Sequence, residues 1–272
     1  MVTYADLAPL FSVESVGPSS FRPANGVPED EGRLLGGLVL GLALRAASQT
    51  VPAERTVHSL HAYFLRAGRS TQPLTLEVAA VRDGRSFSVR RIDAVQDGTA
   101  IATVNASYVA PGARSDGPEL DWQLASTAIG DPDAFDLPDP IVAGSVLLAG
   151  FEVRDAVPPG HERNSPIHPY WARARQPLPD DPAVHASVIA LMSDCGVSAT
   201  SCGPGIRIRS RLASASLDHA VWFHRPVRTD EWMLVSGRSQ TDVSWRGFGH
   251  ATVQDRRGRL VASIAQEVLR VV

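Results

Sequence analysis

The chain has 272 residues and a net charge of −3, and all 26 of its basic residues are arginine. This length suffices for one large domain or for two domains of about 130 residues each. The charge gives no sign of a nucleic-acid partner, which usually requires a basic surface. Without lysine the chain cannot form a Schiff base, hold pyridoxal phosphate covalently or build a Walker-type nucleotide site.

The sequence predicts a cytoplasmic protein. Its longest apolar run, residues 34–44, is much shorter than the ~20 residues that a membrane span requires. Met1 leads into polar and acidic residues rather than into a signal peptide. Two cysteines, Cys195 and Cys202, make neither a disulfide framework nor a zinc site. Richness in arginine and alanine without lysine suggests a GC-rich bacterial genome.

Residues up to 110 predict an opening strand at 10–21 and then a helix at 33–49. Gly37 and Gly41 lie four residues apart inside this helix. Glycine inside a helix costs about 1 kcal/mol relative to alanine. We therefore expect another backbone to approach this face of the helix closely.

Three or four antiparallel strands are expected after this helix. One is predicted at 56–66, and the next at 74–80, where apolar and polar residues alternate as in a half-buried strand. Asp-Gly pairs at 83–84 and 97–98 have the composition of hairpin turns.

The second half repeats this order after a linker. Residues 111–140 are rich in Pro, Gly and Asp and lack periodicity, and we place the linker at 111–146. A helix is expected to begin at Asp181 and Pro182, which suit the N-cap and the first helical position. Strands are predicted at 151–155, 207–225, 232–239, 244–254 and 260–271.

Short segments of the two halves are also similar, about 160 residues apart. YFLRAG (63–68) matches WFHRPV (222–227), VQDG (95–98) matches VQDRRG (253–258), and IATVNAS (101–107) matches VASIAQE (261–267). We therefore predict an α+β protein with two copies of one unit, residues 1–110 and 147–272. Each unit is expected to be a long helix wrapped by an antiparallel sheet.

The segment SLDHAVWFHRP (216–226) gathers a serine, an aspartate and two histidines. Ser216 does not lie in the G-x-S-x-G elbow that presents the nucleophile of α/β hydrolases. His219 and His224 are five residues apart and would face opposite sides of a strand, which argues against a shared metal ion. We expect a strand with structural histidines, and the residues alone leave the roles of Ser216 and Asp218 open.

Comparison of the two halves singles out three polar positions in the second one. Gln266 falls opposite Ala106, Ser216 falls opposite Val57, and Asp194 has no acidic counterpart in the first helix. Burying a carboxylate in an apolar helix is costly unless the group is paired or functional.

Two other interpretations of this helix remain open. Asp194 could cap the end of the helix. Cys195 could be a nucleophile, but no histidine lies near it in the sequence to act as a base, so we expect a small buried side chain.

Several segments resemble the acyl-CoA thioesterase II family, in order and over nearly the whole chain. They are VHSLHAYFLRAG (57–68), RDGRSFSVRRIDAVQDG (82–98), SDCG (193–196), SLDHAVWFHRP (216–226) and ASIAQE (262–267). The resemblance implies a double-hotdog fold that forms one pseudo-dimeric unit. The chain departs from the family in the first helix, where members often carry glutamines and this chain has Leu38 and Leu42.

The family places an aspartate, a threonine or serine, and a glutamine around a water molecule. By motif, these residues match Asp194, Ser216 and Gln266. The resemblance thus implies hydrolysis of a fatty acyl-CoA to a free fatty acid and CoA without a metal or a cofactor. Asp194 would activate the water, Ser216 and Gln266 would hold it, and a backbone N–H near a helix terminus would stabilise the oxyanion.

The expected partner is the acyl-CoA substrate, and further association into a homo-oligomer is expected. With no lysine present, arginines must bind the CoA phosphates, and the candidates are Arg85, Arg90 and Arg225. Two alternatives are an acyl-CoA binding or sensing protein without turnover, and a hotdog-fold enoyl-CoA hydratase. The hydratase would need an Asp–His pair, for which Asp218 and His219 are the candidates.

Overall fold

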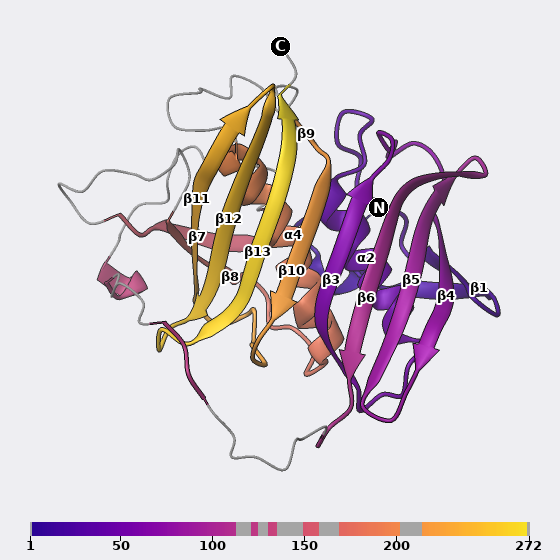
Figure 1. Ribbon diagram of the computed structural model, residues 1–272, viewed down its shortest axis with the longest axis horizontal. Coiled ribbons are helices and arrows are strands. Elements are labelled where there is room, and N and C mark those ends of the chain that lie inside the picture. The colour runs from indigo at the N-terminus through magenta and orange to yellow at the C-terminus, as the bar shows by residue number, and fades with distance from the viewer. Residues whose placement is uncertain are drawn as a thin grey trace.

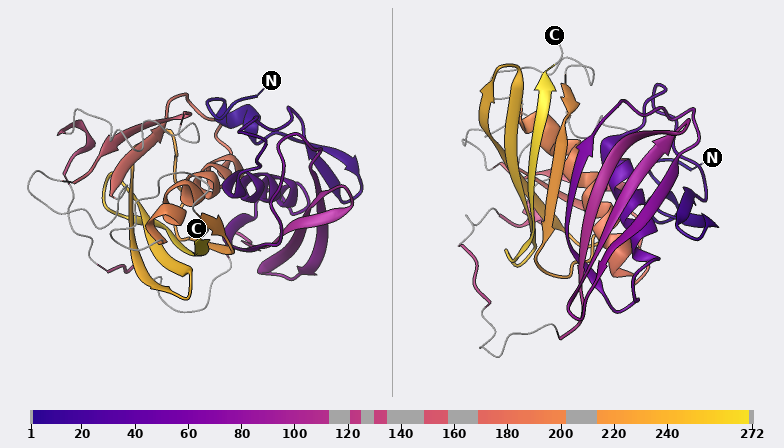
Figure 2. Two further views of the ribbon diagram at one scale, coloured as in Figure 1. Left: turned by 90° about the horizontal axis from the view of Figure 1, so that it is seen from above. Right: turned by 45° about the vertical axis from the view of Figure 1, so that its right-hand side comes forward.

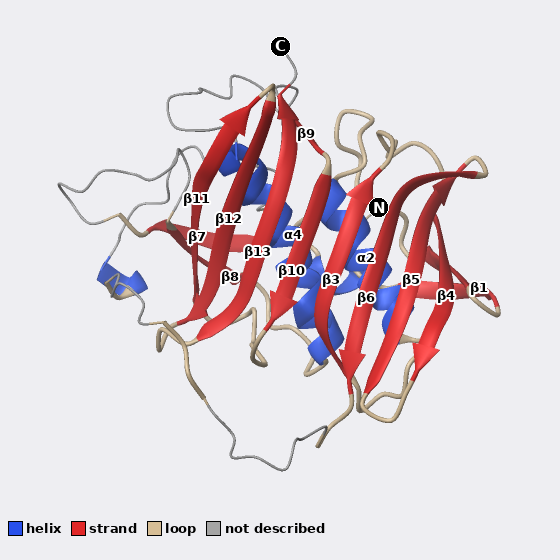
Figure 3. Ribbon diagram, in the orientation of Figure 1, coloured by secondary structure: helices blue, strands red, loops and turns tan. Residues whose placement is uncertain are grey.

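The computed structural model describes residues 2–112, 121–124, 130–134, 149–157, 169–201 and 214–270. Its two long helices are α2 (Gly36–Ser48) and α4 (Pro182–Ser201), with a short α1 (Leu7–Leu10) and a 3₁₀ turn, η1 (Pro132–Ala134). Both long helices lie on the same side of a large sheet (Figures 1 and 3). No helix in these residues is long and apolar enough to cross a membrane.

Strands of the first half precede residue 112, and those of the second half follow residue 149. The first half contributes β1 (Val13–Gly17), β2 (Ser20–Pro23), β3 (Thr56–Phe64), β4 (Thr75–Asp83), β5 (Phe87–Gln96) and β6 (Thr99–Val109). The second half contributes β7 (Phe151–Asp155), β8 (Tyr170–Ala174), β9 (Ser214–Ser216), β10 (Asp218–Phe223), β11 (Met233–Val243), β12 (Arg246–Asp255) and β13 (Leu260–Arg270).

These strands form one antiparallel sheet that crosses the boundary between the halves. Its order is β1-β2-β4-β5-β6-β3-β10-β13-β12-β11-β8-β7, and β9 pairs with β13. The two halves join at β3 and β10, where Leu60 lies opposite Val221. Seen from above, the two helices lie side by side within the curve of the sheet (Figure 2).

The helices pack closely because two glycines of α2 face the backbone of α4. A Cβ atom added at Gly37 would lie 2.7 Å from the carbonyl oxygen of Leu191, and one at Gly41 would lie 2.9 Å from that of Ser187. The later glycine of α2 contacts the earlier residue of α4, so the two helices are antiparallel. The predicted approach of another backbone to this helix face is confirmed.

The expected opening strand at 10–21 is wrong. Leu10 ends α1, and the rest of the segment forms the hairpin of β1 and β2. Pro18 follows Gly17 in the turn, and since proline has no N–H to donate to a ladder, one continuous strand cannot form there.

Other element boundaries differ by a few residues. The helix expected at 33–49 begins at Gly36, because the Leu34 N–H bonds to the carbonyl oxygen of Gly68. The strand expected at 207–225 is divided at Leu217 into β9 and β10, and residues 207–213 lie outside the described residues. Asp97 and Gly98 both adopt positive φ, as the predicted hairpin turn requires.

Candidate active site

Asp194, Ser216 and Gln266 come together between α4 and the sheet. The Nε2 group of Gln266 donates to Oδ1 of Asp194 at 2.9 Å and to Oγ of Ser216 at 2.7 Å. The hydroxyl of Ser216 lies 3.2 Å from the same Oδ1 atom. Three residues from distant parts of the chain therefore form one hydrogen-bonded cluster.

The other oxygen of the Asp194 carboxylate is bound by the first half of the chain. Its Oδ2 atom accepts the backbone N–H of Gly37 at 2.8 Å. Gly37 is the second residue of α2, so the carboxylate lies at the positive end of that helix. A helix N-terminus stabilises a negative charge, which offsets part of the cost of burying this side chain.

Local structure explains how each member of the cluster is positioned. Asp194 follows Leu191 by three residues, so both face α2 from the same side of α4. Gln266 alternates with Ile264 and Val268 along β13, and all three are buried. Ser216 ends the short β9, where it pairs with Val268 and remains half-buried.

Gln266 and Asp194 are almost completely removed from solvent, at 0% and 5% exposed. Only the Ser216 side of the cluster is partly open, so a small reactant would approach from there. The ring of Phe64 lies beside the carboxylate, because a Cβ atom built at Gly36 would come within 3.0 Å of both Phe64 and Oδ2 of Asp194. The site thus combines a buried polar cluster with an apolar wall.

His219 is part of the surroundings of this cluster. It is 1% exposed, and its Nε2 atom lies 2.7 Å from Oγ of Ser193, the residue before Asp194. Burial lowers the pKa of His219, although the nearby carboxylate of Asp194 opposes this shift. The imidazole is therefore neutral at neutral pH.

Asp218 and His219 do not act as a pair. Oδ1 of Asp218 accepts the backbone N–H of Glu267 at 2.9 Å, whereas His219 points into the core and bonds to Ser193. His224 lies near the surface and bonds to Ser263. Within the described residues no group of three His, Cys, Asp or Glu side chains could hold a metal ion.

The arginines expected to bind CoA differ in their surroundings. Arg90 is 3% exposed, and its guanidinium bonds to Asp83, to Thr50 and to backbone carbonyls. This residue braces the hairpin of β4 and β5 and is not available to a ligand. Arg225 bonds to the Leu260 carbonyl and to Asp121, and Arg85 is exposed.

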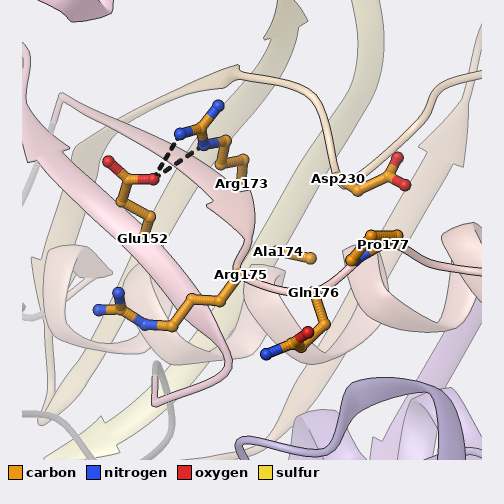
Figure 4. A pocket seen from close by; sticks show the side chains of 7 residues that line it. All are labelled: Glu152, Arg173, Ala174, Arg175, Gln176, Pro177 and Asp230. Carbon is orange, nitrogen blue, oxygen red and sulfur yellow. Dashed lines mark hydrogen bonds and ion pairs between the residues drawn. The ribbon is translucent and has the colours of Figure 1, made fainter.

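A depression of about 310 Å³ lies elsewhere, beside β7 and β8 (Figure 4). Its lining is mostly polar and includes the ion pair of Glu152 with Arg173. No member of the Asp194 cluster lines it. It therefore does not belong to the candidate active site.

Sequence reasoning identified the three side chains but not Gly37. A backbone donor leaves no trace in side-chain chemistry. The available signal was the pair of glycines in the first helix, which indicated a close neighbour without saying that the neighbour is a carboxylate. The Sγ atom of Cys195, the alternative nucleophile, lies 3.2 Å from the carbonyl oxygen of Leu191.

Comparison with known proteins shows which family this chain resembles. Residues 28–109 match the model of the acyl-CoA thioesterase N-terminal domain, and residues 126–270 match that of the C-terminal domain. The chain is 34% identical over 260 residues to acyl-coenzyme A thioesterase 8 of Mus musculus, which covers 86% of this chain and 79% of the relative.

Solved structures show the same relationship. The crystal structure of the acyl-CoA thioesterase II TesB2 from Mycobacterium marinum is 32% identical, with a TM-score of 0.81 over 97% of this chain and 98% of that one. A protein of unknown function with a hotdog fold from Alicyclobacillus acidocaldarius is 18% identical, with a TM-score of 0.73 over 100% and 99% of the chains, and shows the fold alone. The chain thus has a hotdog fold, and it belongs to the acyl-CoA thioesterase II family.

Proposed function

We propose that this protein hydrolyses acyl-CoA thioesters to a free acid and CoA, with Asp194 as the general base. The observation that carries the proposal is the contact of one carboxylate with an amide, a hydroxyl and a helix N-terminus. The names of the relatives support the reaction class.

The nucleophile is a water molecule bound at the half-buried side of the cluster. Ser216 and Nε2 of Gln266 hold this water by hydrogen bonds, so the direct contact between these two side chains gives way to the water. One proton of the water passes to Oδ1 of Asp194 as the water oxygen attacks the thioester carbonyl. The carbon–sulfur bond of the tetrahedral intermediate then breaks, and CoA leaves as a thiolate that takes up the proton held by Asp194, which restores the carboxylate. General-base assistance of this kind is worth about 10²–10⁴ in rate.

The oxyanion of the tetrahedral intermediate requires a donor other than Gly37, whose N–H is occupied by Asp194. The first intrahelical bond of α2 runs from the N–H of Val39 to the carbonyl of Leu35. The N–H groups of Gly36 and Leu38 precede it and have no acceptor of their own within the helix. We assign the oxyanion to this first turn, where one donor is worth about 10²–10³ in kcat.

The two halves are, in this proposal, two copies of one hotdog unit in a double-hotdog chain, residues 1–110 and 147–272, joined by a linker at 111–146. The register supports this division. In the first half, Leu60 of β3 lies opposite Ala106 of β6. In the second half, Ala220 of β10 lies opposite Ala265 of β13, so in this antiparallel pair His219 falls opposite Gln266. The pair of His219 and Gln266 is therefore equivalent to the pair of Leu60 and Ala106. The second copy thus carries polar side chains where the first carries apolar ones.

Three further features belong to the same proposal. The substrate is a fatty acyl-CoA, the protein acts in the cytoplasm of a bacterium, and it associates into a homo-oligomer. Arg225 and Arg85 remain the candidates for the phosphates of CoA. Arg225 would have to exchange Asp121, its exposed partner, for a phosphate.

The test is thiol release from a ladder of acyl-CoAs, from acetyl to palmitoyl, followed with a thiol-reactive dye. Wild type and Asp194→Asn are compared, because asparagine keeps the shape of the side chain but cannot accept the proton. Release by wild type alone supports the proposal and gives the chain-length preference. If wild type binds acyl-CoA without releasing thiol, or removes the absorbance of an enoyl-CoA instead, the proposal is wrong.

A further inference from the structure

The amide of Gln266 can serve the cluster in only one of its two orientations. Both hydrogens of Nε2 are used, one on Asp194 and one on Ser216. If the amide were turned by 180°, its oxygen would face the Asp194 carboxylate, and two acceptors would meet in a buried site. A further interaction, at the oxygen end of the amide, would fix the orientation in which Nε2 faces Asp194.

The other end of this amide is buried and unsatisfied. Oε1 of Gln266 has no hydrogen-bond partner among the described residues. Nδ1 of His219 is in the same situation, while the Nε2 atom of that ring is bound to Ser193. Leaving two such atoms unpaired is costly, because a buried polar group without a partner loses its interaction with water.

The two unsatisfied atoms belong to neighbouring side chains. In the pairing of β10 with β13, Ala220 lies opposite Ala265, which places His219 and Gln266 next to one another on adjacent strands. Both side chains face the core. Burial lowers the pKa of the imidazole, and the neighbouring side chains of Asp194, Gln266 and Asp218 oppose this shift.

Counting protons decides which nitrogen of the neutral ring carries the hydrogen. The single hydroxyl proton of Ser193 can go to the carbonyl of Ala190 at 2.9 Å or to Nε2 of His219 at 2.7 Å. In the first case Nε2 donates to Ser193, and a bare Nδ1 meets the oxygen of Gln266. In the second case Ser193 donates to Nε2, and an Nδ1–H donates to that oxygen, so that both atoms are satisfied.

We propose that His219 is a positioning residue whose Nδ1–H donates to Oε1 of Gln266 and fixes the orientation of the amide. Protons then point in one direction along the whole chain, from Ser193 through His219 and Gln266 to the carboxylate of Asp194. His219 touches neither the substrate nor the water. Its effect on turnover rests on the proposed thioesterase function.

Two amide substitutions separate the two ends of the imidazole ring. In His219→Asn the side-chain NH₂ group lies near the former Nδ1 position and can still donate to Gln266. In His219→Gln the amide extends to the former Nε2 position and serves only Ser193. Both variants are neutral and remove the imidazole, so they form a matched pair.

We expect His219→Asn to keep kcat within about threefold of wild type, and His219→Gln to lower kcat about tenfold with little change in KM. Tenfold is the loss that one hydrogen bond of ordinary strength produces. Equal losses in the two variants would overturn the proposal.

A double-mutant cycle distinguishes positioning from a general structural role. In a Gln266→Ala background the amide is absent, so His219→Gln should lower kcat no further. If the substitution costs the same factor in both backgrounds, His219 does not act through Gln266, and the proposal is wrong.

A spectroscopic measurement tests the hydrogen bond without reference to activity. Long-range ¹H–¹⁵N NMR of wild type with labelled histidine should show His219 protonated at Nδ1 and bare at Nε2 near pH 7, with assignment from His219→Asn. A ring protonated at Nε2 alone would refute the inference. If wild type releases no thiol from any acyl-CoA, the proposed function fails, while the tautomer still reports on the bond.

Discussion

The carboxylate of Asp194 and the backbone N–H of Gly37 lie 2.8 Å apart although 157 residues separate them in the sequence. The contact joins the late part of α4 to the first turn of α2. It exists only because glycine allows the two helices to approach. The geometry of the candidate site therefore depends on the packing of a helix that carries none of its three candidate side chains.

Substituting Gly37 tests this dependence. In Gly37→Ala the new methyl group would lie 2.7 Å from the carbonyl oxygen of Leu191 and 2.9 Å from Cβ of Asp194. We expect α4 to shift, the free energy of unfolding to fall by about 1–3 kcal/mol, and kcat to fall by at least about tenfold as the carboxylate is displaced.

Gly41→Ala is the matched control, one turn further along the same helix. Its methyl group would meet the Ser187 carbonyl and the ring of Phe11, so a similar loss of stability is expected. Because the nearest neighbours of this methyl group are Phe11 and Ser187 and not Asp194, kcat should stay near the wild-type value. Equal kcat values for the two variants would show that the Gly37 contact does not matter for turnover.

Asp194→Asn should lower kcat by about 10²–10⁴, the usual contribution of a general base. The variant should remain folded, since the substitution preserves the volume of the side chain. Thiol release and thermal unfolding measured on the same preparation check both statements. A folded variant with wild-type kcat would remove Asp194 from the mechanism.

Ser216 is expected to position the water rather than to accept its proton. Ser216→Ala should therefore cost less than Asp194→Asn, about tenfold in kcat for one lost hydrogen bond. Ser216→Thr should retain activity, because it keeps the hydroxyl at a half-buried strand end that accommodates a β-branched side chain. Initial rates of Ser216→Ala, Ser216→Thr and Asp194→Asn with one acyl-CoA give the order of their activities. An inactive threonine variant together with an active alanine variant would contradict the proposed role of the hydroxyl.

The free energy of unfolding should fall as the pH is lowered below about 6.5. Burial lowers the pKa of His219 and of His185 below the ordinary histidine value of about 6.5, so the unfolded chain binds more protons than the folded one in this range. Stability therefore rises with pH through this window and is complete above it. Denaturant unfolding at pH 7, 6 and 5 measures the slope, and a flat profile would contradict it.

Carboxylates change the free energy of unfolding at a lower pH than the histidines do, so the two contributions can be measured separately. Burial opposes ionisation of Asp230, but hydrogen bonds from Arg228 and from the Leu178 N–H outweigh it and lower the pKa from 3.8. This contribution to stability is present above pH 3.8 and is lost as the pH falls through the lowered value.

The sequence predicted the regular elements better than their ends. The helix glycines, the alternation from Leu74 to Val78 and the Asp97-Gly98 turn depend on local rules, and the structure confirms them. Ala80, expected on the buried face, is exposed, because the register shifts after it. The prediction of one strand at 10–21 misses the hairpin of β1 and β2, because it includes Gly17-Pro18 in the strand. The short β8 was not predicted, because its first three residues are all buried and the segment lacks the alternation typical of a half-buried strand.

The candidate site was predicted as three residues without their geometry. Comparison of the halves marked Asp194, Ser216 and Gln266 because each is polar where the other half is apolar or small. Their meeting depends on the strand register and on the close packing of two helices, which no local pattern specifies. Their catalytic roles remain predictions that the variants above will test.

The contact between Gly37 and Asp194 also bears on how such a chain can change over time. In a dimer of identical subunits every substitution appears twice, so a side chain gained at one site is also imposed on the symmetry-related site. In the double-hotdog chain proposed above, joining both units in one gene removes that constraint: Val57 and Ala106 can stay apolar while Ser216 and Gln266 do not. The cost is mutual dependence, since a recombinant that inherits either half from a distant homologue must also inherit a compatible helix spacing.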